Sequence, residues 1–271
     1  MAREKGVPVV VTNLFTATCN RSPSQLKLQG AMTRSLLALP GWGMIKNQLV
    51  WESFRKADRM IVGLEAERQV LRAVYGLSDA RITTVPLGLH RDFLEAGKPS
   101  RRDPCLITTG TITNRKRSIE LALMARRAEV PILFVGKPYH RDDPYRKQFA
   151  ALVDNRFVLH RDHVEDRAEL IALLQASRGF VIYSQYENWC LSAHEAAACG
   201  LPLLVPDLPW SRECFAGQAS YLDAKNSEQN PAKLRLFYER CPSLDAPDIK
   251  LYSWDDVANR LKACYQTLLK S

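Results

Sequence analysis

Two glutamates with seven residues between them are the side chains whose type and spacing most suggest chemistry. Glu187 lies just past a short apolar run, and Glu195 lies in a following stretch that we expect to be helical. A loop that enters a helix presents free backbone N–H groups, and the helix dipole adds partial positive charge. Gly200 is well placed to end this helix in a left-handed conformation. The segment therefore predicts a seat for a phosphate.

The same residues allow a purely structural interpretation. Ser192 and Glu195 have the spacing of a capping box, in which Ser192 caps the helix and Glu195 reaches back to the Ser192 N–H. The local pattern favours neither interpretation of Glu195 over the other. Glu187 follows a strand end and has no comparable structural explanation.

A basic cluster supplies the cations that a phosphate would need. Arg115, Lys116 and Arg117 are consecutive and follow a predicted strand. They could form the solvated start of a helix, but cations at that end oppose the helix dipole. This mild cost favours binding of a phosphate over simple solvation.

Alternating strands and helices must position these groups. A polar stretch with one glycine and two prolines, Glu95–Pro104, is interpreted as a linker. After the linker, short apolar strands alternate with helices, and this alternation predicts βαβ units and a parallel sheet. Such a sheet binds ligands at the carboxyl ends of its strands. The expected strands are Cys105–Thr109, Ile132–Val135, Phe157–Leu159, Gly179–Tyr183 and Leu203–Val205, and the expected helices are Lys116–Arg127, Tyr145–Val153, Arg167–Ala176 and Ala193–Cys199.

Fewer elements are evident before the linker. We expect strands at Val7–Thr12, Ala57–Gly63 and Arg81–Pro86, and a helix over Glu65–Val74. A final helix is expected at Trp254–Leu269. The predicted parts are residues 1–95, residues 96–253 and the closing segment 254–271.

Composition narrows the class of protein. The net charge of +9 would suit nucleic acid, an anionic membrane surface or a polyphosphate, but no basic stripe interleaved with aromatic residues supports nucleic acid. The apolar stretch Val7–Val11 is too short for the core of a signal peptide. Seven scattered cysteines without a C-x-x-C pair indicate a reducing compartment. We therefore expect a cytoplasmic protein, with peripheral attachment at the inner membrane surface left open.

Other motifs are weaker. His160 and His163 could form half of a metal site, but no third ligand lies nearby in the sequence, so no metal is expected. Trp189 could stack on a sugar or fill the core beneath the loop, and Trp210 presents the same choice; the core is the default for both.

Five segments in order resemble one enzyme family. Glu187-x7-Glu195 followed by Ala-x-x-x-Gly-Leu-Pro resembles the E-x7-E signature of the retaining GT-B glycosyltransferases of family 4. The other four are Ala57–Val62, Val85–Phe93, Gly110–Lys116 and Asp207–Glu213, which resemble further segments of that family in the family's order. The resemblance extends from about Val7 onward.

The resemblance implies an α/β, GT-B-like fold with a complete C-terminal Rossmann-like domain and a truncated N-terminal Rossmann-like part. It implies transfer of a sugar from a UDP- or GDP-linked donor to an unidentified acceptor, with retention of configuration and without a metal. In such a protein Glu187, Lys116 and Arg115 would be the catalytic groups, and Glu195 would hold the ribose. The remaining donor-binding positions would be Gly110, Thr111, Asn188, Trp189, Cys190, Leu191 and Ser192.

Several departures qualify the resemblance. Thr111 occupies the usual arginine position, Cys190 replaces a glycine, His90 replaces an aspartate, and Asn13 lies about where the family has a histidine. The first strands of the N-terminal domain are missing from the pattern. The alternatives are a non-catalytic donor-binding or scaffold subunit that needs a partner chain, a homo-oligomer that completes the site, or the same fold with epimerase or phosphorylase-like chemistry.

Overall fold

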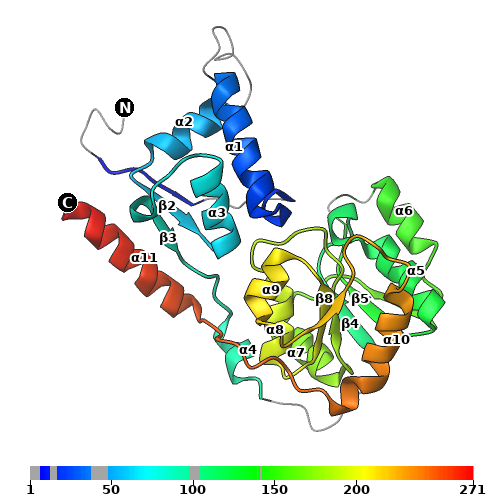
Figure 1. Cartoon of the computed structure of the whole chain (residues 1–271). Helices are drawn as coiled ribbons and strands as arrows, with labels where there is room; N and C mark the ends of the chain where they lie inside the picture. The colour runs from blue at the N-terminus through cyan, green and yellow to red at the C-terminus, as the bar shows by residue number, and fades with distance from the viewer. Residues whose placement is uncertain are drawn as a thin grey trace. The chain divides into compact units, whose positions relative to one another are not determined.

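The computed structural model describes residues 7–12, 17–37, 48–97, 104–138, 140 and 142–270. The chain divides into two compact units. Unit 1 contains Met1–Gly88 and Trp254–Ser271, and unit 2 contains Leu89–Ser253. Helices and strands are numbered in chain order, and Figure 1 labels most of them. No helix in the described part of the chain is long and apolar enough to cross a membrane.

Unit 2 is built on a six-stranded parallel sheet, as the alternating pattern predicts. Its strands are β4 (Leu106–Thr109), β5 (Ile132–Val135), β6 (Val158–Arg161), β7 (Phe180–Val181), β8 (Leu203–Pro206) and β9 (Ser220–Leu222). The spatial order is β6-β5-β4-β7-β8-β9, and every neighbouring pair is parallel. This is the strand order of a doubly wound Rossmann-like sheet.

Helices cover both faces of this sheet, as Figure 1 shows. Helices α5 (Ser118–Ala128), α6 (Pro144–Ala150) and α10 (Asn230–Arg240) cover one face, and α7 (Arg167–Ala176), α8 (Leu191–Ala198) and α9 (Pro209–Phe215) cover the other. Because both faces are covered, the strands can be apolar throughout, and β8 is buried at all four positions. The helices α9 and α10 and the strand β9 were not predicted.

The strand order places a switch point between β4 and β7. From β4 the chain proceeds outward to β5 and β6, and it then returns to lay β7 on the opposite side of β4. The segments that follow β4 and β7 therefore leave the same edge of the sheet next to each other, where ligands bind in such sheets. These two segments carry the predicted basic cluster and Glu187.

Unit 1 holds a three-stranded parallel sheet in its described residues. Its strands are β1 (Val10–Thr12), β2 (Arg59–Val62) and β3 (Ile82–Thr84), in that spatial order. Its helices are α1 (Pro23–Leu37), α2 (Gln48–Lys56), α3 (Glu65–Ala73) and α11 (Trp254–Leu269). Val257 and Cys264 of α11 form a small core with Ile61 and Val85, so the last helix packs in unit 1.

The boundary between the two parts differs from the predicted one. We predicted it after residue 95, but the division falls after Gly88. Helix α4 (Arg91–Glu95) is the reason, because it packs against α7 and α8 of unit 2. The packing therefore changes a few residues before the polar stretch that suggested the boundary.

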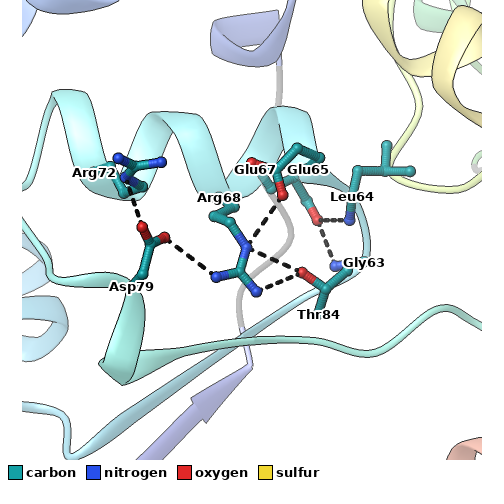
Figure 2. A network of polar contacts seen from close by, with 8 residues as sticks. All are labelled: Gly63, Leu64, Glu65, Glu67, Arg68, Arg72, Asp79 and Thr84. Carbon is teal, nitrogen blue, oxygen red and sulfur yellow. Dashed lines mark hydrogen bonds and ion pairs between the residues drawn. The ribbon is translucent and has the colours of Figure 1, made fainter.

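A polar network fixes the turn from β2 into α3 (Figure 2). The buried Glu67 carboxylate accepts hydrogen bonds from the backbone N–H groups of Gly63 at 2.7 Å and Leu64 at 3.1 Å. Two backbone donors immediately before the helix, at the N-cap and at the residue preceding it, are satisfied in this way. The Arg68 guanidinium donates to Thr84 Oγ1 at 3.1 Å and also pairs with Glu65 and Asp79. The network thus fastens α3 to the end of β3.

Candidate functional site

Glu187 lies where two cations converge. Its Oε1 atom is 2.7 Å from the Lys116 Nζ atom and 3.0 Å from the Arg115 Nη1 atom. All three side chains are largely withdrawn from water, with exposed fractions of 10% for Glu187, 14% for Lys116 and 30% for Arg115. The sequence left Glu187 without an explanation, and the structure supplies this ion-pair cluster.

A short turn aims the two cations. Arg115 and Lys116 lie in a 3-10 helix, Asn114–Lys116, which Thr113 caps by accepting from the Lys116 N–H at 3.4 Å. Helix α5 then begins at Ser118, two residues later than predicted. The interpretation of this cluster as a solvated helix start is therefore wrong for the first two cations.

Backbone contacts tie this turn to the segment after β7. The Gln185 N–H donates to the Arg115 carbonyl at 2.8 Å, and the Arg115 guanidinium donates to the Tyr186 carbonyl at 3.2 Å. The guanidinium also lies 5.7 Å from the centre of the Tyr186 ring. Arg115 thus holds the loop that carries Glu187 beside the switch point.

The cations decide the protonation state of Glu187. Burial acts to raise the pKa of this carboxyl, but Lys116 and Arg115 outweigh the burial, and the pKa falls below its ordinary value of 4.5. Glu187 is therefore ionised at neutral pH, and its charge neutralises part of the positive charge of the cluster.

The capping-box interpretation of Glu195 is wrong. Helix α8 begins at Leu191, and its N-cap is Cys190, which makes no side-chain capping bond. Ser192 is therefore already inside the helix, and its hydroxyl lies 3.7 Å from the Cys190 Sγ atom. The predicted helix start at Ala193 was two residues late. Glu195 is left without the structural role that competed with ligand binding.

Glu195 has an environment opposite to that of Glu187. No hydrogen bond or ion pair joins its carboxylate to another residue in the described ranges. Burial raises the pKa of Glu195, and the more distant charges of Arg167 and Lys116 only partly offset that rise. A half-buried acceptor of this kind gains from the hydroxyl donors of a ligand.

Cys190 adopts a backbone conformation that normally favours glycine. Its φ of 59° and ψ of 64° lie in the left-handed region. Its side chain is only 5% exposed, and burial raises the pKa of the thiol to about 12. The thiol therefore stays protonated and is not a nucleophile at neutral pH.

Two glycines let neighbouring strand ends approach closely at the same edge. Gly110 has a φ of 142°, and a Cβ placed there would lie 3.4 Å from the Lys116 Cε atom. A Cβ on Gly136 would lie only 1.9 Å from the Gly110 carbonyl oxygen, so no other residue fits. Thr111 lines a small cavity together with Gly110 and Lys116. The Lys116 side chain thus lies beside Gly110, where another residue would carry a Cβ atom.

The remaining predicted binding residues form the loop and first turn of α8. Asn188 and Trp189 are half-buried in the loop after Glu187, and Leu191 and Ser192 open the helix. Trp189 stacks on His194, with ring centres 4.8 Å apart and an angle of 11° between the planes. Trp189 therefore already has a packing partner, and the fully buried Trp210 belongs to the core as predicted.

His194 supports the loop around Cys190, a role that the sequence did not predict. Its Nδ1 atom lies 3.1 Å from the Cys190 carbonyl oxygen. Burial lowers the pKa of His194 to about 4, so the ring is neutral at physiological pH. It supports the loop around Cys190 from within the protein.

Two other histidines noted in the sequence have structural contacts. Within the described residues, no three His, Cys, Asp or Glu side chains are grouped to hold a metal ion. His160 lies 2.9 Å from the Gly136 carbonyl oxygen through its Nε2 atom. His90 caps α4 by accepting from the Asp92 N–H at 3.4 Å. Asn13 lies outside the described residues.

Together these groups offer the positive charge and the hydrogen-bond acceptor that an anion attached to a hydroxylated molecule would need. Two cations and the start of α8 provide positive charge at the switch point. Glu195, which has no partner within the described residues, lies about one turn further along α8. Cations and backbone N–H groups stabilise phosphate oxygens. A carboxylate such as Glu195 suits hydroxyl donors.

Comparison with known proteins identifies the family. Residues 45–227 match the model of the family 4 glycosyltransferases in conflict systems. The chain belongs to this family. Its sequence is also 29% identical to the glycogen synthase of Mycobacterium tuberculosis over 191 residues, which are 67% of this chain and 42% of the relative.

Solved structures agree on the fold, which is of the GT-B type as predicted. The pneumococcal O-GlcNAc transferase GtfA with UDP and GlcNAc has a TM-score of 0.61 at 18% identity, covering 83% of this chain and 48% of GtfA. Anabaena HepE with UDP and glucose has a TM-score of 0.65 at 14% identity, covering all of this chain and 73% of HepE. The chain spans about half the length of the relatives and structures that it first matches.

Proposed function

We propose that this chain binds a nucleoside-diphosphate sugar in unit 2 and transfers the sugar with retention of its anomeric configuration. The observation that carries the proposal is the convergence of Lys116 and Arg115 on Glu187 at the switch point, beside the start of α8. Membership of a family 4 glycosyltransferase family supports it. The UDP complexes of GtfA and HepE support the class of donor.

In this proposal each group has one task. Lys116 and Arg115 stabilise the charge that develops on the departing pyrophosphate, which makes a metal unnecessary. The ionised Glu187 faces the transferred sugar. Glu195 accepts hydrogen bonds from the ribose hydroxyls. The acceptor oxygen bonds to the anomeric carbon on the face from which the phosphate leaves, the bond from that carbon to the phosphate oxygen breaks, and the departing phosphate takes the proton of the acceptor hydroxyl.

The test is turnover of candidate donors by the purified chain. UDP-, GDP- and ADP-glucose are supplied separately, the released nucleotide is measured, and proton NMR records the first anomer of the free sugar. We expect release from one donor with retained α-configuration, and its loss in Lys116→Ala. An initial β-product would contradict retention, and turnover that survives in Lys116→Ala would contradict the assigned site.

A second candidate is a donor-binding subunit that depends on a partner chain. Unit 1 shows three strands in its described residues against six in unit 2, and one solved neighbour is the GtfA/B complex, with a TM-score of 0.60. A chain that binds one nucleotide selectively but releases no sugar would favour this candidate. Turnover restored by a second chain would then identify the partner.

A further inference from the structure

A second hollow in unit 2 lies apart from the residues assigned to the donor. It has a volume of about 380 Å³ and opens between α5, the segment after β7 and the loop that joins β9 to α10. This volume is within the range of sites for small molecules. Glu187, Glu195 and Lys116 do not line it.

Positive charge predominates around this hollow. Three cations line it, namely Arg117, Arg127 and Lys225, against a single carboxylate, Glu120. Among the residues that the structure describes, neither Arg127 nor Lys225 has an ion-pair partner. These two side chains come from different elements, and Lys225 also lies within electrostatic range of the Asp223 carboxylate.

The wall of the hollow is rigid. The fully buried Asn230 donates from its Nδ2 atom to the Tyr183 hydroxyl at 3.1 Å and to the Asp223 carbonyl at 2.8 Å. The Tyr183 hydroxyl donates to the same carbonyl at 2.9 Å. The β9–α10 loop is therefore fixed to the end of β7 before any ligand arrives, which lowers the entropic cost of binding.

Arg117 joins this wall to the basic turn. It lies in the left-handed region with a φ of 51°, and its guanidinium lies 5.0 Å from the centre of the Tyr183 ring and donates to the Ala224 carbonyl at 3.2 Å. This conformation is unfavourable for a residue other than glycine. Arg115 and Lys116 point toward Glu187, whereas the next residue, Arg117, lines the second hollow.

We propose that this hollow binds a small polyanion that carries phosphate or carboxylate groups, held by Arg127 and Lys225. The partly exposed Leu123 side chain offers an apolar surface for the uncharged part of such a ligand. The site is independent of the donor site, so it stands or falls separately from the proposed transferase activity.

Calorimetric titration of the Lys116→Ala chain with inorganic pyrophosphate and with citrate tests the proposal, because that background removes the donor-site lysine. Two double variants are made in the Lys116→Ala background. The test variant is Arg127→Gln/Lys225→Gln. The control variant, Arg126→Gln/Lys250→Gln, removes two exposed charges that do not line the hollow. We expect binding of at least one anion to weaken about tenfold or more in the test pair, because charge-assisted hydrogen bonds to the anion are lost. The control pair is expected to bind as its parent does.

Three results would overturn the proposal. Equal weakening in both pairs would mean that general charge, not the hollow, attracts the anion. Absence of binding in the Lys116→Ala background would mean that only the donor site takes these anions. Unchanged binding in Arg127→Gln/Lys225→Gln, shown to be folded by circular dichroism, would place the anion elsewhere.

Discussion

The two glutamate carboxyl groups at the ends of the segment from Glu187 to Glu195 lie in different environments. At the loop end, Glu187 is paired with Lys116 and Arg115, and its pKa is lowered. In the helix, Glu195 makes no such contact among the described residues, and burial raises its pKa. One carboxylate is thus paired with two cations, and the other has no partner within the described residues.

This difference indicates separate functions. Glu187 keeps two cations in place and can exchange part of their interaction for a ligand's phosphate. Glu195 has no hydrogen-bond or ion-pair partner within the described residues, and in the proposed function the ligand's hydroxyls would donate to it. Polar groups that are buried without partners are unfavourable in a folded chain and are found where function needs them.

The largest expected effect comes from removing the cation that acts on both carboxylates. Lys116→Ala should lower kcat/KM for the active donor about 10²- to 10³-fold, because one aimed donor to developing negative charge is lost. Steady-state release of nucleotide measures this effect. Lys116→Arg is the control, since it keeps the charge and should recover part of the rate. A loss of kcat/KM below about threefold in Lys116→Ala would contradict the role assigned to this lysine.

A smaller effect is expected at Arg115, which is more exposed and divides its contacts between Glu187 and the Tyr186 carbonyl. Arg115→Gln should lower kcat/KM about tenfold, within the range for one hydrogen bond to a charged group. The same nucleotide-release measurement applies. A loss as large as that of Lys116→Ala would mean that Arg115 has taken over the principal role, in place of the arginine that Thr111 replaces.

Opposite pKa shifts predict opposite stability effects. The lowered pKa of Glu187 means that its ionised form stabilises the fold above pH 4.5, and that this gain is lost as the pH falls through its folded pKa. The raised pKa of Glu195 means that stability is complete below pH 4.5 and is lost as the pH rises through its folded pKa. At pH 7, Glu187→Gln should therefore lower Tm and Glu195→Gln should raise it.

Thermal unfolding from pH 4 to pH 8 measures both changes. A shift of about 2–4 °C corresponds to 1 kcal/mol in a chain of this size class. Both differences from wild type should shrink toward the acid end of the range. If Glu187→Gln and Glu195→Gln changed Tm in the same direction at pH 7, the opposite environments assigned to the two carboxyl groups would be contradicted.

The smallest effect is expected at Cys190. Cys190→Gly relieves a left-handed conformation that costs roughly 1–2 kcal/mol, but it removes a buried side chain of similar value, so stability should change by less than about 1 kcal/mol. Nucleotide affinity should rise slightly, because the backbone at the start of α8 becomes easier to approach. Denaturant unfolding and nucleotide titration measure the two effects, and a loss of affinity would show that the thiol itself contributes to the site.

Local patterns predicted most of unit 2. The strands β4 to β8 are short apolar runs between helices, and they lie within a few residues of the predicted positions. The strand β9 has three residues, Ser220–Leu222, and is too short to show a pattern. The helix α10 buries only Asn230, Leu234 and Phe237, and its other positions are largely charged or polar. Both elements depend on contacts with the rest of the sheet.

The sequence predicted which residues belong to the site, but not that Glu187 pairs with Arg115 and Lys116. The contacts of Glu187 with Arg115 and Lys116 join residues about 70 positions apart, and only the strand order brings them together. The N-cap at Cys190 depends on a left-handed conformation that residue preferences disfavour, so Ser192 was the better local choice. Tertiary structure overrode the local signal at that point.

Nucleotide affinity of two matched variants tests the central claim most directly. UDP, GDP and ADP are titrated into wild type, Glu187→Gln and Glu195→Gln, each verified as folded. We predict that Glu195→Gln weakens the preferred nucleotide about tenfold or more, whereas Glu187→Gln binds it as tightly as wild type or more tightly, because its cations are released. Equal losses in the two variants, or a loss in Glu187→Gln alone, would contradict the separate functions assigned to these carboxylates.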